Sequence, residues 1–143
     1  MAEYTYNPIQ EIGVNGSAIF NDSIPCTRGL IYHRNESGIF ILRGIVSNPS
    51  ACFARYQVTF NGNVAVPTDE TVAPISMAIS IGGESIQTSN AIVTPTVVDS
   101  YFNITSTAFI DTPKGCCLSV SVENTSTIPI NLQNANLVIV RVA

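Results

Sequence analysis

The chain has 143 residues and a formal net charge of -4 at pH 7, from ten acidic and six basic side chains. Domains cluster near roughly 100 to 150 residues, so a single domain is expected. The basic residues are scattered singly along the sequence, which argues against nucleic-acid binding, because that function needs cations clustered against phosphates.

The composition indicates an all-β subunit that hides part of its surface. Charged residues make up 11% of the chain, less than half of the typical share of about 25%. The mean hydropathy is +0.29, which is high for a monomer that must cover itself with polar groups. We therefore expect burial of surface in an oligomer.

The N-terminal segment "MAEYTYNPIQEIG" lacks the apolar run of a secretion signal, and no stretch reaches the ~20 apolar residues of a membrane helix. We expect synthesis in a host cytoplasm without a signal peptide. Residues 1–12 show no strand regularity, so they are interpreted as a docking arm or a frayed terminus, and 13–143 as one domain. The arm residues proposed for docking are Tyr4, Tyr6, Pro8 and Ile9.

Along the chain, apolar residues alternate with period two between turn signals, and no segment keeps a helical period. The first half predicts short strands at 15–20, 29–33 and 38–46. Polar, turn-rich connections are expected between them, at 21–28 and 34–38.

The clearest strand lies at 54–67, where Tyr56, Val58 and Phe60 share one parity and polar residues hold the other. The next runs through Ile79, and the pair Gly82–Gly83 that follows predicts a tight hairpin.

Three further segments, 101–110, 116–124 and 136–143, complete about eight to ten short strands, a pattern typical of a sandwich or jelly roll. The last segment is apolar on both parities and is predicted to be covered on both sides. The predicted core residues are Tyr56, Val58, Phe60, Ile79, Cys116, Leu118 and Val120.

Catalytic chemistry has little support in the sequence. His33 is the only histidine, it precedes a turn, and no G-x-S-x-G elbow is present. The one adjacent acidic pair, Asp69 and Glu70, is interpreted as a solvated loop. We expect His33 to be a hydrogen-bonded histidine at a strand end, and we expect no enzyme activity and no cofactor.

The cysteines Cys26, Cys52, Cys116 and Cys117 lack the C-x2-C spacing of a zinc site. Adjacent strand residues point to opposite faces, so Cys116 is predicted inside and Cys117 outside or at a subunit contact. No metal is expected. A bridge between Cys26 and Cys52, or between subunits, stays open as an alternative, and the redox state of all four is undetermined.

Three segments resemble a family of small bacterial and phage proteins, of Clostridia type, with a TNF/C1q-like jelly roll. They are "ARYQVTFNGNVAVPTDETVAPISMAISIGGESI" (54–86), "IVTPTVVDSYFNITSTAFIDTPKGCCLSVSVENTS" (92–126) and "NLQNANLVIVRVA" (131–143). The stretch 26–44 is similar to the region that precedes this core. The resemblance implies an antiparallel two-sheet sandwich that forms homotrimers, with the C-terminal strand central in the inner sheet. It implies an interface that includes Leu137, Ile139, Arg141, Arg55 and Gln57.

The role that the resemblance implies is structural: a decoration protein on the surface of a bacteriophage capsid, bound to the major capsid protein or another virion protein. A glycan- or receptor-binding module of a phage fibre or spore coat is the alternative. No tryptophan is available to stack on a sugar, and Tyr32 and Tyr101 are the best substitutes.

Overall fold

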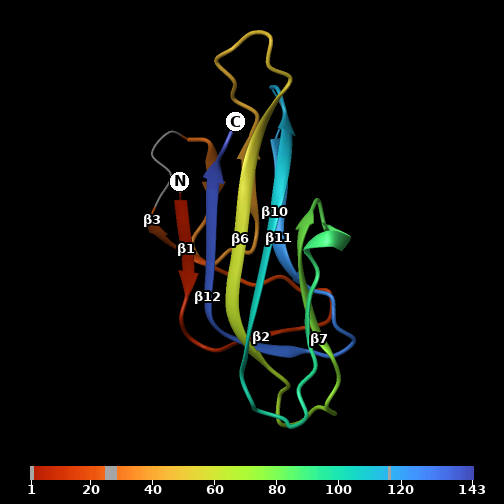
Figure 1. Ribbon diagram of the computed structural model, residues 1–143. Helices are drawn as coiled ribbons and strands as arrows, with labels where there is room; N and C mark the ends of the chain where they lie inside the picture. The colour runs from red at the N-terminus through yellow and green to blue at the C-terminus, as the bar shows by residue number, and fades with distance from the viewer. Residues whose placement is uncertain (1, 25–28, 116) are drawn as a thin grey trace.

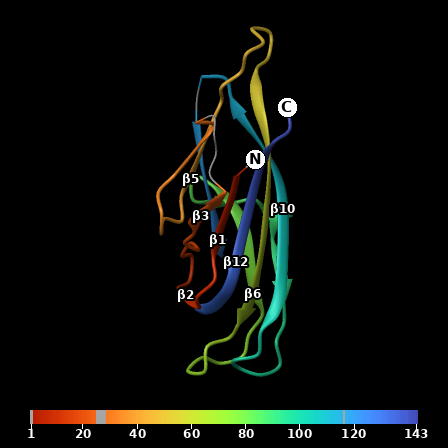
Figure 2. The same cartoon turned by 90° about the vertical axis from the view of Figure 1, so that its left-hand side faces the viewer.

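The computed structural model describes residues 2–24, 29–115 and 117–143. They form two antiparallel β-sheets packed face to face, seen edge-on in Figure 2. We call the sheet nearer the viewer in Figure 1 the front sheet and the other the back sheet. This is the two-sheet jelly-roll sandwich that the sequence predicted.

The front sheet has the strand order β10-β6-β12-β1-β3, with β2 also paired to β12. Its long strands run side by side down the molecule (Figure 1). The bounds are β1 Ala2–Tyr6, β2 Gln10–Ile12, β3 Asn21–Ile24, β6 Phe53–Ala65, β10 Phe102–Pro113 and β12 Ile130–Arg141.

The back sheet has the order β4-β5-β11-β7-β8, with β9 paired to β7. The bounds are β4 Ile31–His33, β5 Phe40–Arg43, β7 Ile75–Ile81, β8 Glu84–Ser85, β9 Ala91–Val93 and β11 Cys117–Asn124. The one helix among the described residues is the 3-10 turn η1, Gln87–Ser89, so none of them forms a helix able to cross a membrane.

Strand β6 organises the front sheet because it pairs with β10 on one side and with β12 on the other. Gly62 in β6 is buried, and a Cβ atom there would lie 2.7 Å from Leu132 Cδ1 and 3.2 Å from the Phe60 ring. The glycine therefore allows Leu132 of β12 to pack closely over β6.

The β7–β8 hairpin turns at Gly82 and Gly83, whose φ angles are +61° and +85°. Positive φ at both central residues is what a type I′ hairpin turn requires, and glycine adopts it without steric penalty. The predicted tight hairpin is confirmed.

The core lies between the sheets and contains the predicted residues Tyr56, Val58, Phe60, Ile79 and Val120, which are 0–1% exposed. Leu118 is half-buried against this core, and Cys116 lies outside the described residues. Aromatic rings extend the core toward the N-terminal strands: the rings of Phe20 and Phe40 lie 5.6 Å apart, and those of Phe20 and Phe60 lie 6.4 Å apart.

The N-terminal segment corrects the expectation of an arm outside the domain. Ala2–Tyr6 pairs along β12 from Ile139 to Ala135, and Gln10–Ile12 pairs with the start of β12. Backbone pairing to a central strand holds the segment, although its side chains do not alternate cleanly in apolarity. The segment is therefore part of the sandwich.

The four docking residues proposed for that arm differ in their exposure to solvent. Tyr4 is 2% exposed, and its ring contacts those of His33 and Phe40 at 4.8 and 4.6 Å, so it is a core residue and cannot dock on a partner. Tyr6 is half-buried, whereas Pro8 and Ile9 are exposed between β1 and β2.

The first half of the chain differs from the sequence prediction in one further respect. The expected strand at 15–20 contains only isolated bridges at Ser17 and Phe20. A strand instead begins at Asn21, inside the expected connection, and pairs with β1. Three of its four side chains are exposed and none is buried, so it needs no apolar residues at alternate positions and lacks the alternation that predicts a strand.

Candidate functional site

The outward surface of the front sheet is built from the residues that alternate with the core along β6, β10 and β12. Strand register aligns them in rows, with Gln57 between Val140 on β12 and Phe109 on β10. We call the uncharged part of this surface the front face. Its residues are Thr5, Gln57, Thr59, Asn61, Asn63, Asn103, Thr105, Thr107, Phe109, Asn136, Val138 and Val140.

Hydrogen bonds within the chain already engage many polar groups of the front face. Asn103 Nδ2 donates to Asn61 Oδ1 at 2.7 Å, and Thr105 Oγ1 donates to Asn103 Oδ1 at 3.1 Å. The hydroxyls of Thr59 and Thr107 lie 3.0 Å apart across the strand pair. Because these groups already bond one another, covering the face would cost less desolvation free energy than burying unbonded amides and hydroxyls.

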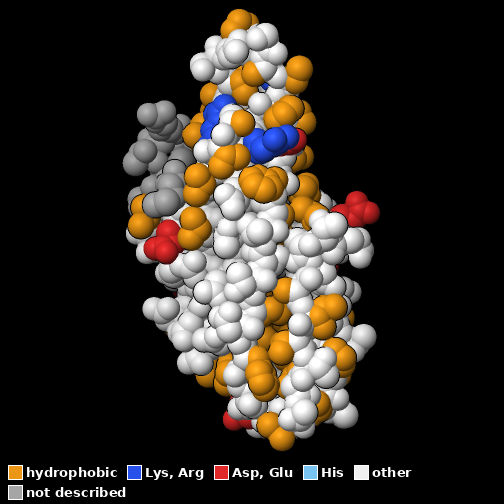
Figure 3. Space-filling view, viewed as in Figure 1, with side chains coloured by type: hydrophobic (Ala, Val, Ile, Leu, Met, Phe, Trp, Pro, Cys, Tyr) orange, Lys and Arg blue, Asp and Glu red, His pale blue; other side chains and the backbone are white. Residues whose placement is uncertain are grey.

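Apolar side chains lie among these polar rows. Phe109 is 63% exposed, and Val138 and Val140 are half-buried. Figure 3 shows the middle of this surface as mostly uncharged and polar, with hydrophobic and basic side chains toward the upper end. An exposed aromatic ring among apolar and uncharged polar side chains is typical of a protein contact.

An ion pair marks the upper edge of the front face. Arg55 Nε donates to Asp111 Oδ1 at 2.7 Å, and Nη2 donates to Oδ2 at 3.0 Å. This hydrogen bonding lowers the pKa of Asp111 and raises the pKa of Arg55. The Arg55 guanidinium also lies 5.1 Å from the centre of the Phe53 ring. The charges of the pair are thus matched within the chain.

The trimer interface expected from the sequence is only partly on this surface. Arg55 and Gln57 face outward, but Leu137 and Ile139 are 0% exposed and belong to the core, so their assignment is wrong. Arg141 lies at the end of β12 and donates to the backbone oxygens of Ala143 and Ile45.

The physical reason for this error is that β12 is apolar on both parities, so the sequence did not show which parity faces outward. Val138 and Val140 are the outward ones, and the sequence analysis did not select them. Phe109 was missed as well. The sequence offered a signal, because Phe109 and Ile110 are adjacent apolar residues in a predicted strand and one of them must face outward.

His33 is held by hydrogen bonds, as the sequence predicted. Its side chain is 1% exposed, with Nδ1 at 2.8 Å from Asp22 Oδ1 and Nε2 at 2.9 Å from the Ser37 backbone oxygen. The ring stacks on Phe40. Both nitrogens therefore contact groups of the chain itself, and the histidine joins β3 of the front sheet to β4 of the back sheet.

Two cysteines lie within the described residues, and both Cys52 and Cys117 are exposed. The outward orientation predicted for Cys117 is confirmed. Cys26 and Cys116 lie outside the described residues, so the alternative bridge between Cys26 and Cys52 stays a prediction from the sequence. Within the described part of the chain, no three histidine, cysteine or acidic side chains are grouped as metal ligands.

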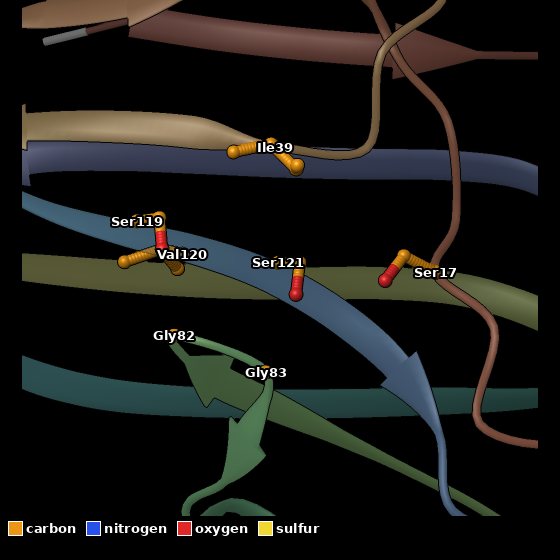
Figure 4. A pocket seen from close by; sticks show the side chains of 7 residues that line it. All are labelled: Ser17, Ile39, Gly82, Gly83, Ser119, Val120 and Ser121. Atoms are coloured by element: carbon orange, nitrogen blue, oxygen red, sulfur yellow. The ribbon is translucent and has the colours of Figure 1, made fainter.

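A shallow hollow lies on the outward side of the back sheet (Figure 4). Its volume is about 260 Å³, and its lining includes Ser17, Ile39, Ser119 and the backbone of Gly82 and Gly83. Ser121 also lines it and shares a hydrogen bond of 2.7 Å with Ser80. The lining is neutral and rich in hydroxyl groups.

The two tyrosines considered for sugar stacking lie in different environments. Tyr32 is 52% exposed on β4, opposite Ile41 of the back sheet. Tyr101 is partly covered, and burial and the nearby charge of Asp99 raise the pKa of its hydroxyl. Of the two, Tyr32 offers the more open ring.

Comparison with solved structures shows which fold this is. The globular domain of zebrafish complement 1qA superposes with a TM-score of 0.70 at 12% identity, covering 99% of this chain and 96% of that one. Murine APRIL superposes with a TM-score of 0.64 at 11% identity, covering 99% of this chain and 98% of that one. Eiger TNF from S. frugiperda superposes with a TM-score of 0.64 at 13% identity, covering 99% of this chain and 91% of that one.

No protein-family model matches the sequence, and no curated protein matches it. At these low identities the structural likeness establishes the TNF/C1q-like jelly-roll fold. The front face, rather than any side-chain chemistry, is then the feature on which a function can be argued.

Proposed function

We propose that the chain is a non-enzymatic structural protein that forms homotrimers through the front face and decorates the surface of a bacteriophage capsid. The observation that carries the proposal is the front face itself. Its rows are almost uncharged: the one carboxylate beside Val138 is Glu3 of β1, which accepts a hydrogen bond of 2.9 Å from Asn136. The face exposes Phe109, and many of its amides and hydroxyls are already hydrogen-bonded within the chain.

The energetics favour covering this surface. Apolar area contributes roughly 25 cal/mol per Å² on burial, and Phe109, Val138 and Val140 supply such area on one flat sheet face. Stable interfaces bury about 800 Å² per partner, an extent that a face running along three long strands is suited to provide. The matched Arg55–Asp111 pair can border the contact without leaving an unpaired charge.

The three-copy arrangement is supported by the family resemblance, which implies inner sheets packed about a three-fold axis. The front sheet, which has β12 in its interior, is the sheet that would face this axis. A particle with three-fold symmetry matches local three-fold positions of an icosahedral shell, and this match supports a capsid surface as the site of action. The major capsid protein would be the partner.

The non-enzymatic part of the proposal is supported by the engagement of His33. A general base must reach a substrate proton, yet both ring nitrogens of His33 lie within hydrogen-bond distance of Asp22 and Ser37. Assembly through apolar area requires no such group.

The first experiment is size-exclusion chromatography with light scattering on the purified chain at moderate salt. We expect a mass three times the 15.3 kDa of one chain, and a particle with the mass of one chain would refute the trimer. The capsid role is tested by cryo-electron microscopy of the virion that carries this protein. Density for the trimer at three-fold positions is expected, and its absence there would refute decoration.

A glycan-binding role is the second candidate, favoured by one observation. The exposed ring of Tyr32 lies on the same outward sheet surface as the hydroxyl-lined hollow of Ser17 and Ser119. Aromatic rings and neutral hydroxyls are groups that bind sugars. A glycan-array screen that returned specific hits lost on Tyr32→Ala would support this role, and a screen without hits would refute it.

A further inference from the structure

Positive charge gathers at one end of the sandwich, although the basic residues are dispersed in sequence. Four of the five described cations lie there: Arg43 at the end of β5, Arg55 at the start of β6, Lys114 after β10 and Arg141 at the end of β12. Figure 3 shows basic side chains at this upper end of the visible surface. We call the four residues and the apolar side chains among them the cationic end.

Backbone hydrogen bonds join these segments. Gly115 N donates to Gly44 O at 3.0 Å, which connects the turn after β10 to the end of β5. Val142 N donates to Arg55 O at 2.9 Å, which connects the C-terminus to β6. The cations are therefore held together by the sandwich and are not spread over independent loops.

Three of the four cations have no carboxylate side chain as partner among the described residues. Arg55 is paired with Asp111, but Lys114 Nζ donates to the Pro49 backbone oxygen, and Arg141 donates to backbone oxygens. The guanidinium of Arg43 is exposed and makes no hydrogen bond or ion pair within the described part of the chain. This end keeps a net positive charge on a chain of net charge -4.

Apolar side chains and hollows accompany these charges. Ile45 is 49% exposed and Val142 is 46% exposed. Ile45 lines a hollow of about 390 Å³ that Arg141 also lines, and another of about 270 Å³ that Arg43 also lines. Each hollow thus combines an apolar wall with a cation, which suits a protein surface that presents carboxylates beside apolar groups.

The opposite end of the same molecule presents such a surface. The loops after β6 and before β10 lie together there (Figure 1), tied by a hydrogen bond of 2.8 Å from Asp99 N to Val66 O. They carry Asp69 and Asp99, both exposed, and Val97, which is 56% exposed. No lysine or arginine occurs anywhere between Arg55 and Lys114, so these two loops carry no cation.

We propose that the cationic end of one copy binds the acidic end of a second copy, so that copies stack end to end along the strand direction. The two ends have the same mixture of apolar and charged side chains with opposite sign, which is the complementarity that orients protein contacts. Because the two surfaces differ, the contact is heterologous and need not close into a ring. We therefore expect a series of species rather than one discrete dimer.

This contact goes beyond the trimer proposed above. Arg55 borders both surfaces, but Arg43 and Lys114 of the cationic end and Asp69 and Asp99 of the acidic end lie off the front face. If trimers form, each end is repeated three times, and the contacts reinforce one another through multivalency. If they do not form, single chains can still stack. The two proposals therefore succeed or fail separately.

The test is sedimentation velocity of the purified chain over a range of protein and salt concentrations. At about 10 mM ionic strength, where the Debye length is about 30 Å, we expect the weight-average sedimentation coefficient to rise with protein concentration. At about 1 M, where that length is about 3 Å, one base particle should remain. The mass of the particle that remains at high salt tests the trimer. The rise of the sedimentation coefficient with protein concentration at low salt tests the end-to-end contact.

Charge reversals identify the surfaces. Arg43→Glu and Asp69→Lys should each abolish growth at low salt, and an equimolar mixture of the two variants should restore it. The matched controls are Arg34→Glu and Glu84→Lys, which change exposed charges away from both ends and should leave growth intact. A wild-type chain that stays at one size at low salt, or controls that lose growth as fully as the end variants, would overturn the proposal.

Discussion

The ring of His33 stacks on Phe40 with their centroids 4.2 Å apart and their planes within 9°. Hydrogen bonds to Asp22 and to the Ser37 backbone hold the same ring, so one side chain links β3 in the front sheet to β4 and β5 in the back sheet. The N-terminal strands thus depend on a histidine that precedes a turn in the sequence.

His33→Ala should therefore destabilise the fold. It removes a buried ring and its hydrogen bonds to Asp22 and to the Ser37 oxygen, which keeps the bond from Phe20 N. A loss of about 2–4 kcal/mol of unfolding free energy is expected. Chemical denaturation followed by circular dichroism measures this. The control is Tyr32→Ala, because Tyr32 is the neighbour in sequence and is 52% exposed; equal losses for the two variants would show that the contacts of His33 contribute little.

Gly62→Ala tests the close packing of β12 on β6. The new Cβ atom would lie 2.7 Å from Leu132 Cδ1, and Leu132 is fully buried, so neighbouring side chains must shift. Overpacking of this kind destabilises by about 1–3 kcal/mol. Gly13→Ala is the matched control, because nothing lies within 4 Å of a Cβ atom there. Thermal or urea unfolding should separate the two variants, and identical midpoints would contradict the packing argument.

The ion pair between Arg55 and Asp111 predicts a dependence of stability on acid. The pKa of Asp111 is lowered in the folded chain below its ordinary value of 3.8 by the hydrogen bond from Arg55. A carboxylate with a depressed folded pKa contributes stability above its unfolded pKa and loses it as the pH falls through the folded pKa.

The comparison is between the wild type and Asp111→Asn, unfolded with urea at several pH values. Above about pH 4 the free energy of unfolding of the wild type should be larger than that of the variant. This difference should disappear at lower pH. Because both side chains are 43% exposed, solvent and salt screen the pair and the excess should be small. An excess that persisted well below the titration of the carboxylate would exclude this origin.

Sequence alternation predicted the sandwich where one sheet face is buried and the other is not. In β6 the parity of Tyr56, Val58 and Phe60 was sufficient, because polar residues hold the opposite parity. In β12 it was not, because Val138 and Ile139 are equally apolar and only the packing of the back sheet decides which is covered. The short edge strand Asn21–Ile24 has only one apolar residue and therefore no alternation to detect.

The cationic end was hidden from the sequence for a different reason. Arg43, Lys114 and Arg141 lie far apart along the chain, and single cations at such spacing predict a dispersed charge. Strand order alone brings them to one end, since β5 and β12 end there and β10 turns there into β11. Clustering of charge is thus a property of topology, which periodicity does not encode.

Phe109→Glu is the sharpest test of the front face. Burying a phenylalanine contributes about 1.5–3 kcal/mol, and each of three copies would lose this while gaining a charge that must be desolvated in the contact. The ring is 63% exposed in the single chain, so the fold itself should tolerate the change. Light scattering should show the mass of one chain, with circular dichroism unchanged.

The matched control is Ile92→Glu. Ile92 is 64% exposed and lies on β9 of the back sheet, away from the front face. The same charge placed there should leave the three-chain mass intact. If Ile92→Glu dissociated the particle while Phe109→Glu did not, the subunits would meet through the back sheet, and the hydrogen-bonded rows of the front face would be a solvated surface.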